Sequence, residues 1–534
     1  MISQAVPASE PASGARTAAA GTFGGLRTRW ALLACVAGGL AVYASFPPLD
    51  VWPLAFAGPA VLVVALTGRS LRGSLACGLV FGLALFVPLL SWLINVAWYA
   101  WFPLALAEAV FFAVFAIGQR LLLRLPFWPV AVAAWWVSVE AFRDRWPFAF
   151  PWGRLAMSQS VAPDVRWVAV GGAPLLTFLV ALTGAMLGRA LLAFLGTGGW
   201  RSRGSLGSAL AFAVTAGVVL AGGFLPVDPT GGAPTTEVAA IQGNIPRARN
   251  LPQQINDSDV TANQIAATQK LAAEVKAGRA PAPGLVVWPE DAVDTVGLDA
   301  SQYQYVYDEV LGAMDTIGQP ILVGEVLQNP LRNVGQLWVP GRGATYPIYV
   351  KRQLVPFGEY IPFRAIISSF SSLPSLQPYN FTAGRNPVVF RVGPTIRLGD
   401  VICYEVGFDN LVRSEVNAGA NVLALQSNDA DFEIDGQLGE TEQQTAMARI
   451  RAVESDRAVV YSSTTGESSI IAPDGALLAR SGTWRQAILE ARVPLVSYRT
   501  LADRVGAWPE YVLVLLTALA LGFACVTAVT RRSF

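Results

Sequence analysis

The stretch GDVICYEVGF, residues 399–408, places Cys403 at the end of a β-rich run, and Cys403 is the only cysteine outside the apolar segments of the chain. The 534 residues contain no histidine. This absence excludes Ser-His-Asp and Cys-His catalysis and disfavours a catalytic zinc site. Cys403 is therefore either a small buried hydrophobe at a strand end or a nucleophile with an unusual partner.

The region around this stretch, from about Asp228 to Ala507, alternates β-rich runs with helical stretches. The β-rich runs are VAAIQ (238–242), GLVVWPE (284–290), PILVGEV (320–326), IRLGDVICYE (396–405) and NVLALQSN (421–428). Asn263–Ala277 and Glu440–Ser455 have the pattern of helices with polar faces. We therefore predict an α/β or layered α+β domain over residues 228–507.

Apolar segments of about 20 residues, long enough to cross a bilayer, occupy most of the remaining sequence. Hydrophobic residues make up 53% of the chain and charged residues 14%, far from an ordinary soluble domain. We expect about eight membrane spans, seven in residues 29–227 and one in residues 508–534. The candidates are Trp30–Leu49, Val51–Gly68, two spans within residues 73–118 with a turn near Asn95–Ala100, Leu125–Val139, Ala169–Gly188, Leu206–Val227 and Tyr511–Thr530.

Arginines flank alternate loops between these segments, which predicts cytoplasmic termini and an extracytoplasmic domain at residues 228–507. Residues 1–28 have the composition of a disordered cytoplasmic tail. The loop after the fifth span is an exception, because its arginines would lie outside. Either that span is wrong, or these arginines have a role such as binding lipid phosphates; they are Arg143, Arg145, Arg154 and Arg166.

The other three cysteines, Cys35, Cys77 and Cys525, lie within predicted spans, so Cys403 has no disulfide partner in its domain. If Cys403 is a nucleophile, its thiol needs a base and a cation, because a free cysteine of pKa about 8.5 is mostly protonated at neutral pH. The near-zero net charge, +1, argues against a nucleic-acid partner.

Candidates for the base and the cation follow other β-rich runs. Glu290 closes LVVWPE, where partial desolvation would raise its pKa toward that of a useful base, or it is an exposed residue at a turn. Lys351 is one of only three lysines, so either a compact ammonium is needed there or it is a surface lysine. Glu359 lies eight residues further on and could orient Lys351.

Together and in this order, W-P-E, K-R-Q-L-V-P-F-G-E-Y-I-P and I-C-Y-E resemble the nitrilase superfamily, whose members use a Glu-Lys-Cys triad on an αββα sandwich. PFAFPWGRLAMSQS (147–160) and AAIQGNIPR (239–247) resemble segments of the apolipoprotein N-acyltransferase family, which embeds such a domain in a membrane. The resemblance covers essentially the whole chain.

This resemblance implies a general base at Glu290, a triad cation at Lys351 and a nucleophile at Cys403. It also implies supporting or substrate-binding roles for Glu359, Tyr404 and Glu405. The implied reaction moves an acyl chain from a phospholipid, such as phosphatidylethanolamine, through a Cys403 thioester to the α-amine of a diacylglyceryl-modified lipoprotein. The implied setting is the bacterial inner membrane, with a monomeric enzyme and neither cofactor nor metal.

The chain departs from the family pattern at two places. Asp431 stands where the family usually has tryptophan, and no tryptophan occurs between Gln242 and Trp288. Both changes bear on lid behaviour and acyl preference. The rival interpretations are a membrane-tethered amidase acting on small amides, a scaffold with an inactive domain, and a transporter using Glu108 and Glu140.

Overall fold

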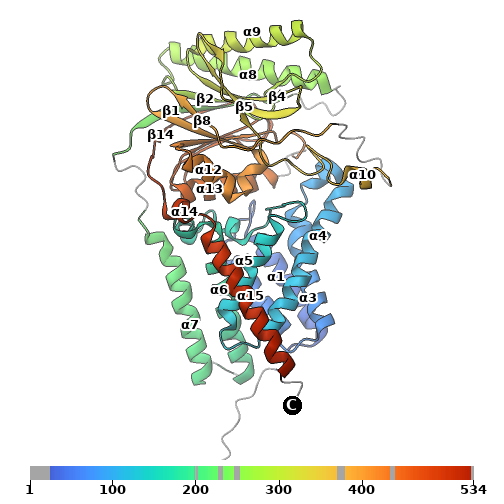
Figure 1. Ribbon diagram of the computed structural model, residues 1–534. Coiled ribbons are helices and arrows are strands. Elements are labelled where there is room, and N and C mark those ends of the chain that lie inside the picture. The colour runs from blue at the N-terminus through green and yellow to red at the C-terminus, as the bar shows by residue number, and fades with distance from the viewer. Residues whose placement is uncertain are drawn as a thin grey trace, which may run out of the picture.

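The computed structural model describes residues 24–197, 199, 202–226, 232–245, 253–369, 379–432 and 439–530. These residues form a bundle of apolar helices and an α/β body of two stacked sheets, drawn in the lower and upper halves of Figure 1. Most of the tail predicted at residues 1–28, and the predicted domain boundary at 227 and 228, lie outside the described residues.

The helical body carries the segments that the sequence predicts as membrane spans. Its helices are α1 (Thr28–Ala44), α2 (Leu54–Leu66), α3 (Leu71–Leu89), α4 (Leu93–Leu122), α5 (Trp128–Arg143), α6 (Val168–Thr197), α7 (Arg203–Leu220) and α15 (Trp508–Thr530), with the 3₁₀ turns η1 (Leu155–Gln159), η2 (Pro163–Trp167) and η3 (Ala221–Phe224).

Among the described residues, five helical stretches are long and apolar enough to cross a membrane. They are Leu71–Leu89, Trp98–Leu122, Pro163–Gly196, Arg203–Phe224 and Trp508–Ala528. Because α1 and α2 are shorter apolar helices, the total of about eight spans stays a prediction.

The turn expected near Asn95–Ala100 was wrong, because α4 already begins at Leu93. Pro88 lies in the last turn of α3, which ends at Leu89. Proline is disfavoured in helix interiors, since it lacks a backbone N–H and its ring crowds the preceding turn. The chain therefore turns at residues 90–92.

Two sheets form the core of the α/β body. The first has the order β14-β1-β2-β4-β5-β6, with β3 beside β4 and β7 beside β5; the second has the order β13-β12-β11-β10-β9-β8. The strands of the first are β1 (Thr235–Gln242), β2 (Leu285–Val287), β3 (Val293–Asp294), β4 (Ile321–Leu327), β5 (Arg332–Val339), β6 (Gly343–Ala344), β7 (Tyr349–Val350) and β14 (Ala487–Pro494). Those of the second are β8 (Val389–Val392), β9 (Ile396–Ile402), β10 (Val422–Ser427), β11 (Val459–Ser463), β12 (Ser469–Ile471) and β13 (Leu477–Arg480).

Alternation along the strands decides which side chains face the other sheet. Val238 and Ala240 of β1 join the apolar cluster between the sheets, whereas Ala239 and Ile241 join the cluster beneath α8 (Gln253–Lys276) and α9 (Ala300–Ile317). β1 therefore has two buried faces.

Helices cover the outer face of each sheet. In Figure 1, α8 and α9 lie at the far end of the molecule, and α12 (Asp409–Asn417) and α13 (Glu440–Ser455) lie between the second sheet and the helical body. The α/β body also contains two short helices, α10 (Arg364–Ile367) and α14 (Leu501–Val505). The predicted α/β domain and its αββα layering are confirmed.

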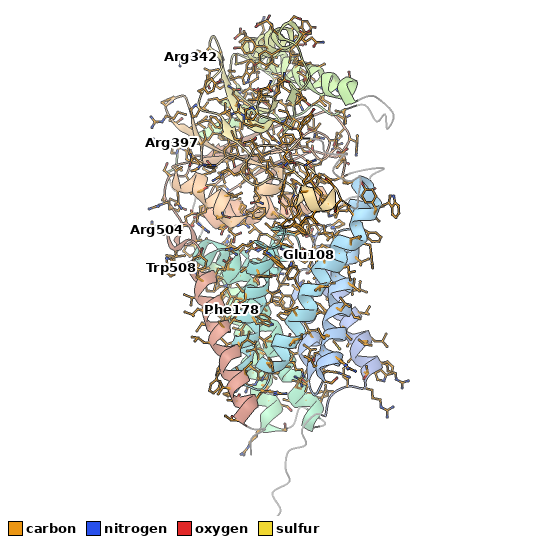
Figure 2. All side chains as sticks on the ribbon, turned by 45° about the vertical axis from the view of Figure 1, so that its right-hand side comes forward. Glu108, Phe178, Arg342, Arg397, Arg504 and Trp508 are labelled. Carbon is orange, nitrogen blue, oxygen red and sulfur yellow. The ribbon has the colours of Figure 1, made fainter. Side chains whose placement is uncertain are left out.

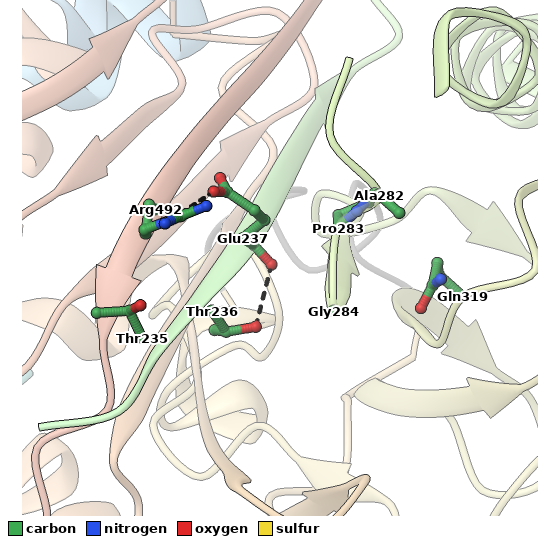
Figure 3. Close-up of a pocket in the computed structure, with 8 residues that line it drawn as sticks. All are labelled: Thr235, Thr236, Glu237, Ala282, Pro283, Gly284, Gln319 and Arg492. Carbon is green, nitrogen blue, oxygen red and sulfur yellow. Dashed lines mark hydrogen bonds and ion pairs between the residues drawn. The ribbon is translucent and has the colours of Figure 1, made fainter. Parts of the chain in front are cut away.

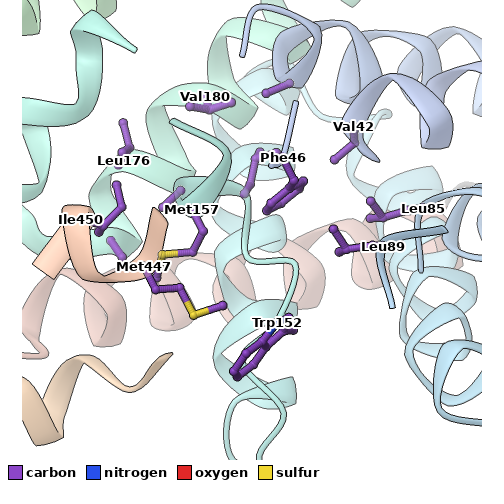
Figure 4. Packing of buried hydrophobic residues seen from close by; sticks show 14 of the residues in the cluster. Val42, Phe46, Leu85, Leu89, Trp152, Met157, Leu176, Val180, Met447 and Ile450 are labelled. Atoms are coloured by element: carbon purple, nitrogen blue, oxygen red, sulfur yellow. The ribbon is translucent and has the colours of Figure 1, made fainter. Parts of the chain in front are cut away.

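One apolar cluster joins the two bodies. Met447 and Ile450 of α13 belong to the same buried cluster as Met157 and Leu176 of the helical body, and Figure 4 shows these side chains close together. The second sheet is therefore joined to the helical body through α13.

Candidate active site

Glu290, Lys351 and Cys403 come from different strands. Lys351 directly follows β7 and Glu290 lies just beyond β2, both in the first sheet, whereas Cys403 directly follows β9 in the second. All three side chains are buried. The charges of Glu290 and Lys351 both act on the pKa of the Cys403 thiol, so the structure brings the three residues to one site.

The Lys351 ammonium lies between two carboxylates. Its Nζ is 2.8 Å from Glu290 Oε1 and 2.9 Å from Glu359 Oε1. Burial opposes the charge of Lys351, but Glu290, Glu359 and Cys403 outweigh it and hold the pKa of Lys351 well above its usual range. Lys351 is therefore a fixed cation beside the thiol.

The two oxygens of Glu290 have different surroundings. Oε1 accepts hydrogen bonds from Lys351 and from Asn333 Nδ2, the latter at 2.6 Å. Oε2 accepts the backbone N–H of Asn428 at 3.0 Å. The carboxylate is thus fixed through Oε1, while Oε2 keeps a lone pair for a proton.

Cys403 occupies a strained position at the start of η4 (Cys403–Gly407). Its φ of 50° lies in the left-handed region, which costs free energy for a residue with a Cβ. Burial raises the pKa of its thiol well above the usual value; Glu290 raises this pKa further, while Lys351 lowers it. The resting sulfur is therefore a thiol, and attack requires a base.

Tyr404 points toward the helical body. Its hydroxyl donates to the backbone oxygen of Ala149 at 2.7 Å, and its ring stacks on Trp152 with centroids 5.5 Å apart. The residue after the thiol therefore anchors the active-site turn on the segment that follows α5.

Glu405 is fully buried and accepts hydrogen bonds from both sides of the site. Oε1 accepts the backbone N–H groups of Arg352 and Gln353, and Oε2 accepts the hydroxyl of Tyr349 and the backbone N–H of Ile402. This carboxylate clamps the segment around Lys351 to the turn that carries Cys403.

A separate hollow of about 530 Å³ lies at the opposite edge of the first sheet. Figure 3 shows it between the starts of β1 and β2 and the end of β14, beside the ion pair of Glu237 and Arg492. The candidate residues follow the carboxyl ends of the strands, so this hollow is not their site. Within the described ranges, no group of three or more Asp, Glu or Cys side chains could hold a metal ion.

Family models and relatives match both bodies of the chain. Residues 38–186 match the apolipoprotein N-acyltransferase N-terminal domain, and residues 237–503 match the carbon-nitrogen hydrolase family. A Mycolicibacterium smegmatis protein named apolipoprotein N-acyltransferase is 36% identical over 91% of this chain and 83% of its own length. The chain belongs to the apolipoprotein N-acyltransferase family.

Other members of the apolipoprotein N-acyltransferase family match over a similar length. The Pseudomonas syringae pv. tomato protein of that name is 28% identical over 93% of this chain and 96% of its own length. Among solved structures, an amidase from Nesterenkonia sp. is 19% identical, with a TM-score of 0.35, and covers 50% of this chain and 92% of that one.

Two buried amide side chains at the candidate active site were not predicted from the sequence. Asn333 of β5 donates to Glu290 and also to Glu359, at 3.2 Å, and Gln444 of α13 donates to the Cys403 sulfur at 3.5 Å. The sequence predicts a helix with a polar face at Glu440–Ser455, whereas every residue of α13 except Arg449 is buried, so Gln444 carried no usable signal.

The four arginines after the fifth predicted span mostly hold the fold together. Arg143 pairs with Glu108, Arg154 pairs with Asp144 and Asp409, and Arg166 donates to backbone oxygens near η3. Arg145 is half exposed and pairs with Glu510. Figure 2 places Glu108 near the junction of the two bodies, so its ion pair with Arg143 lies close to the active-site side.

The segment that departs from the family pattern lies against the helical body. Phe432, next to Asp431, meets Trp92 edge to face at 5.3 Å, and its backbone oxygen accepts from Asn95. Residues 433–438, which follow, lie outside the described residues.

Proposed function

We propose that this protein transfers an acyl chain from a membrane phospholipid to the α-amine of a diacylglyceryl-modified cysteine at the N-terminus of a lipoprotein. The observation that carries the proposal is a buried thiol beside a fixed Lys351–Glu290 pair, in a chain whose relatives are named apolipoprotein N-acyltransferase over nearly their whole length. Phosphatidylethanolamine is the proposed donor, and a monomer the proposed form.

In the first step, Glu290 Oε2 takes the thiol proton and the Cys403 sulfur attacks the ester carbonyl of the donor. Lys351, with the backbone N–H groups that follow the nucleophile, stabilises the tetrahedral oxyanion. The carbon–oxygen bond of the ester then breaks, and the lysophospholipid oxygen leaves with the proton that Glu290 held. Cys403 keeps the acyl group as a thioester.

In the second step, the lipoprotein amine attacks the thioester carbon. Glu290 takes a proton from the amine, the carbon–sulfur bond breaks, and the sulfur leaves as a thiolate that recovers this proton. An amide forms and the free enzyme returns. Transfer rather than hydrolysis requires water to be kept from the thioester, and the apolar cluster between α13 and the helical body supports such exclusion.

A membrane-tethered amidase is the alternative, since water could attack the same thioester. Membership of the acyltransferase family favours transfer. Two lipid substrates also explain why the α/β body rests on a large helical body, which a simple tether would not require.

The proposed topology follows the distribution of arginines. We propose about eight spans, seven in residues 29–227 and one in residues 508–534, cytoplasmic termini, and a catalytic domain at residues 228–507 on the extracytoplasmic face of the inner membrane. Reporter fusions after residues 226 and 530 should report opposite sides of the membrane.

Intact-protein mass spectrometry after incubation with phosphatidylethanolamine and no acceptor tests the function. We expect a fatty-acyl mass increment that hydroxylamine removes, and its absence in Cys403→Ala. Cys525→Ser, which removes an exposed cysteine of α15, should keep the adduct. An active preparation that releases fatty acid and never carries the increment would favour the amidase.

A further inference from the structure

Gln444 donates a hydrogen bond to the Cys403 sulfur. Its Nε2 lies 3.5 Å from Cys403 Sγ, and the side chain is 1% exposed. Every residue of α13 except Arg449 is buried, so the backbone under Gln444 has little freedom. The amide is therefore held at the reacting atom.

A chain of hydrogen bonds fixes the orientation of this amide. Gln444 Oε1 accepts the hydroxyl of Tyr461 at 2.9 Å, which leaves Nε2 facing the sulfur. The Tyr461 oxygen lies 3.1 Å from Asp429 Oδ2, and Ser427 and Ser463 both donate to Asp429 at 2.6 Å.

We propose that Gln444 is a catalytic residue that donates an N–H to the Cys403 thiolate, in the orientation that Tyr461 fixes. This inference deepens the proposed function, because it rests on Cys403 as the nucleophile.

The sulfur carries negative charge at two moments of the proposed reaction, as the attacking thiolate and as the leaving group of the second step. Hydrogen bonds to charged acceptors are stronger than those to neutral ones. The N–H of Gln444 therefore stabilises the negatively charged sulfur more than the neutral thiol or thioester.

The rate at which iodoacetamide alkylates Cys403 tests this, measured from pH 6 up to the pH at which the rate levels off, on the full-length protein in detergent without lipid and read on the Cys403 peptide. We expect Gln444→Leu to raise the apparent pKa of Cys403 by about one unit, and so to slow alkylation about tenfold below that pKa. The rate at high pH should stay the same, because the thiolate itself remains accessible.

Gln443→Leu is the matched control. Gln443 is the neighbouring buried amide, but it donates to the backbone oxygen of Leu89 and makes no contact with the sulfur. Its profile should keep the wild-type midpoint. Tyr461→Phe, which leaves Gln444 in place without its orienting partner, should shift the midpoint in the same direction by a smaller amount.

If Gln444→Leu does not fold, Gln444→Glu gives the second measurement, since it keeps the shape and sets a carboxylate beside the sulfur. It should raise the midpoint more than Gln444→Leu would. A midpoint within 0.2 units of wild type in either folded variant overturns the inference. Because no lipid is present, this result is independent of whether the acyl-enzyme forms.

Discussion

Each oxygen of the Glu405 carboxylate accepts two hydrogen bonds. Oε1 accepts two backbone N–H groups. Oε2 accepts the Tyr349 hydroxyl and the backbone N–H of Ile402. Glu405→Gln would set an amide NH₂ against at least one of these pairs of donors. We expect acyl-enzyme formation to slow about 100-fold, because small displacements of reacting groups cost factors of this size.

Single-turnover formation of the Cys403 adduct measures this loss. Glu309→Gln is the control, since Glu309 is an exposed residue of α9 that accepts a hydrogen bond from Tyr305 of the same helix. A Glu405→Gln protein that acylates at the wild-type rate would show that the clamp does not position the proposed triad.

Residue types at strand ends made Glu290, Lys351 and Cys403 candidates, and the family resemblance implied their roles, because each stands in a short motif that can be read locally. The amides of Asn333 and Gln444 could not be found this way. Asn333 lies on β5 and Gln444 on α13, and each reaches the site only through tertiary packing. The clamp at Glu405 was likewise hidden, since three of its four partners lie 52 to 56 residues earlier in the chain.

At the scale of elements, β4 passes very close to the segment that carries Glu290. A Cβ on Gly324 would lie 2.1 Å from the backbone oxygen of Pro289 and 2.8 Å from Glu290 Cα. Gly324→Ala must therefore push β4 and Glu290 apart. We expect a loss of about 1–3 kcal/mol in the free energy of unfolding and a larger proportional loss of acyl-enzyme formation.

Denaturant unfolding and single-turnover acylation, measured side by side, separate these two effects. Gly312→Ala on α9 is the control, because a Cβ there meets nothing within 4 Å and alanine favours a helix by about 1 kcal/mol. Full activity in Gly324→Ala would mean that the active-site segment does not depend on β4.

The five β-rich runs that the sequence predicted lie at nearly the positions of β1, β2, β4, β9 and β10, because apolar runs are local features. Other elements of the α/β body, such as β5, β11 and α9, were not predicted. Strand order was not predicted. β1 pairs with β14, which brings Thr235 opposite Pro494, and no local pattern in either strand specifies that register. In the helical body, the apolar segments were predicted but their lengths were not. α1 and α2 are apolar, yet they are shorter than the helices that are long enough to cross a membrane.

At the scale of the whole molecule, the junction of the two bodies combines apolar packing with buried ion pairs. Met447 and Ile450 supply apolar contact from α13, and Tyr404 hydrogen-bonds across the junction to Ala149. The active-site turn is therefore part of the junction. Loosening the junction should move Cys403 as well as weaken the fold.

Asp409 is the charged centre of this junction. Arg154, from the segment after α5, donates to both of its oxygens at 2.7 and 3.0 Å, and Arg451 of α13 lies 2.6 Å from Oδ1. Asp409→Asn leaves two buried guanidinium groups without this countercharge. Because removing one partner of a buried ion pair leaves an uncompensated charge, we expect a loss of about 3–5 kcal/mol in the free energy of unfolding.

The pH dependence of stability gives the second part of this prediction. Burial alone would raise the pKa of Asp409, but Arg154 and Arg451 outweigh it and hold this pKa well below its usual range. The carboxylate therefore stabilises the folded protein above its unfolded pKa of about 3.9, and this contribution is lost as the pH falls through the folded value. Thermal midpoints should differ most between wild type and Asp409→Asn near neutral pH and converge in acid, whereas the exposed Asp315→Asn should follow wild type throughout. A difference that stays constant down to pH 3 would mean that the ion pairs of Asp409 do not hold the two bodies together.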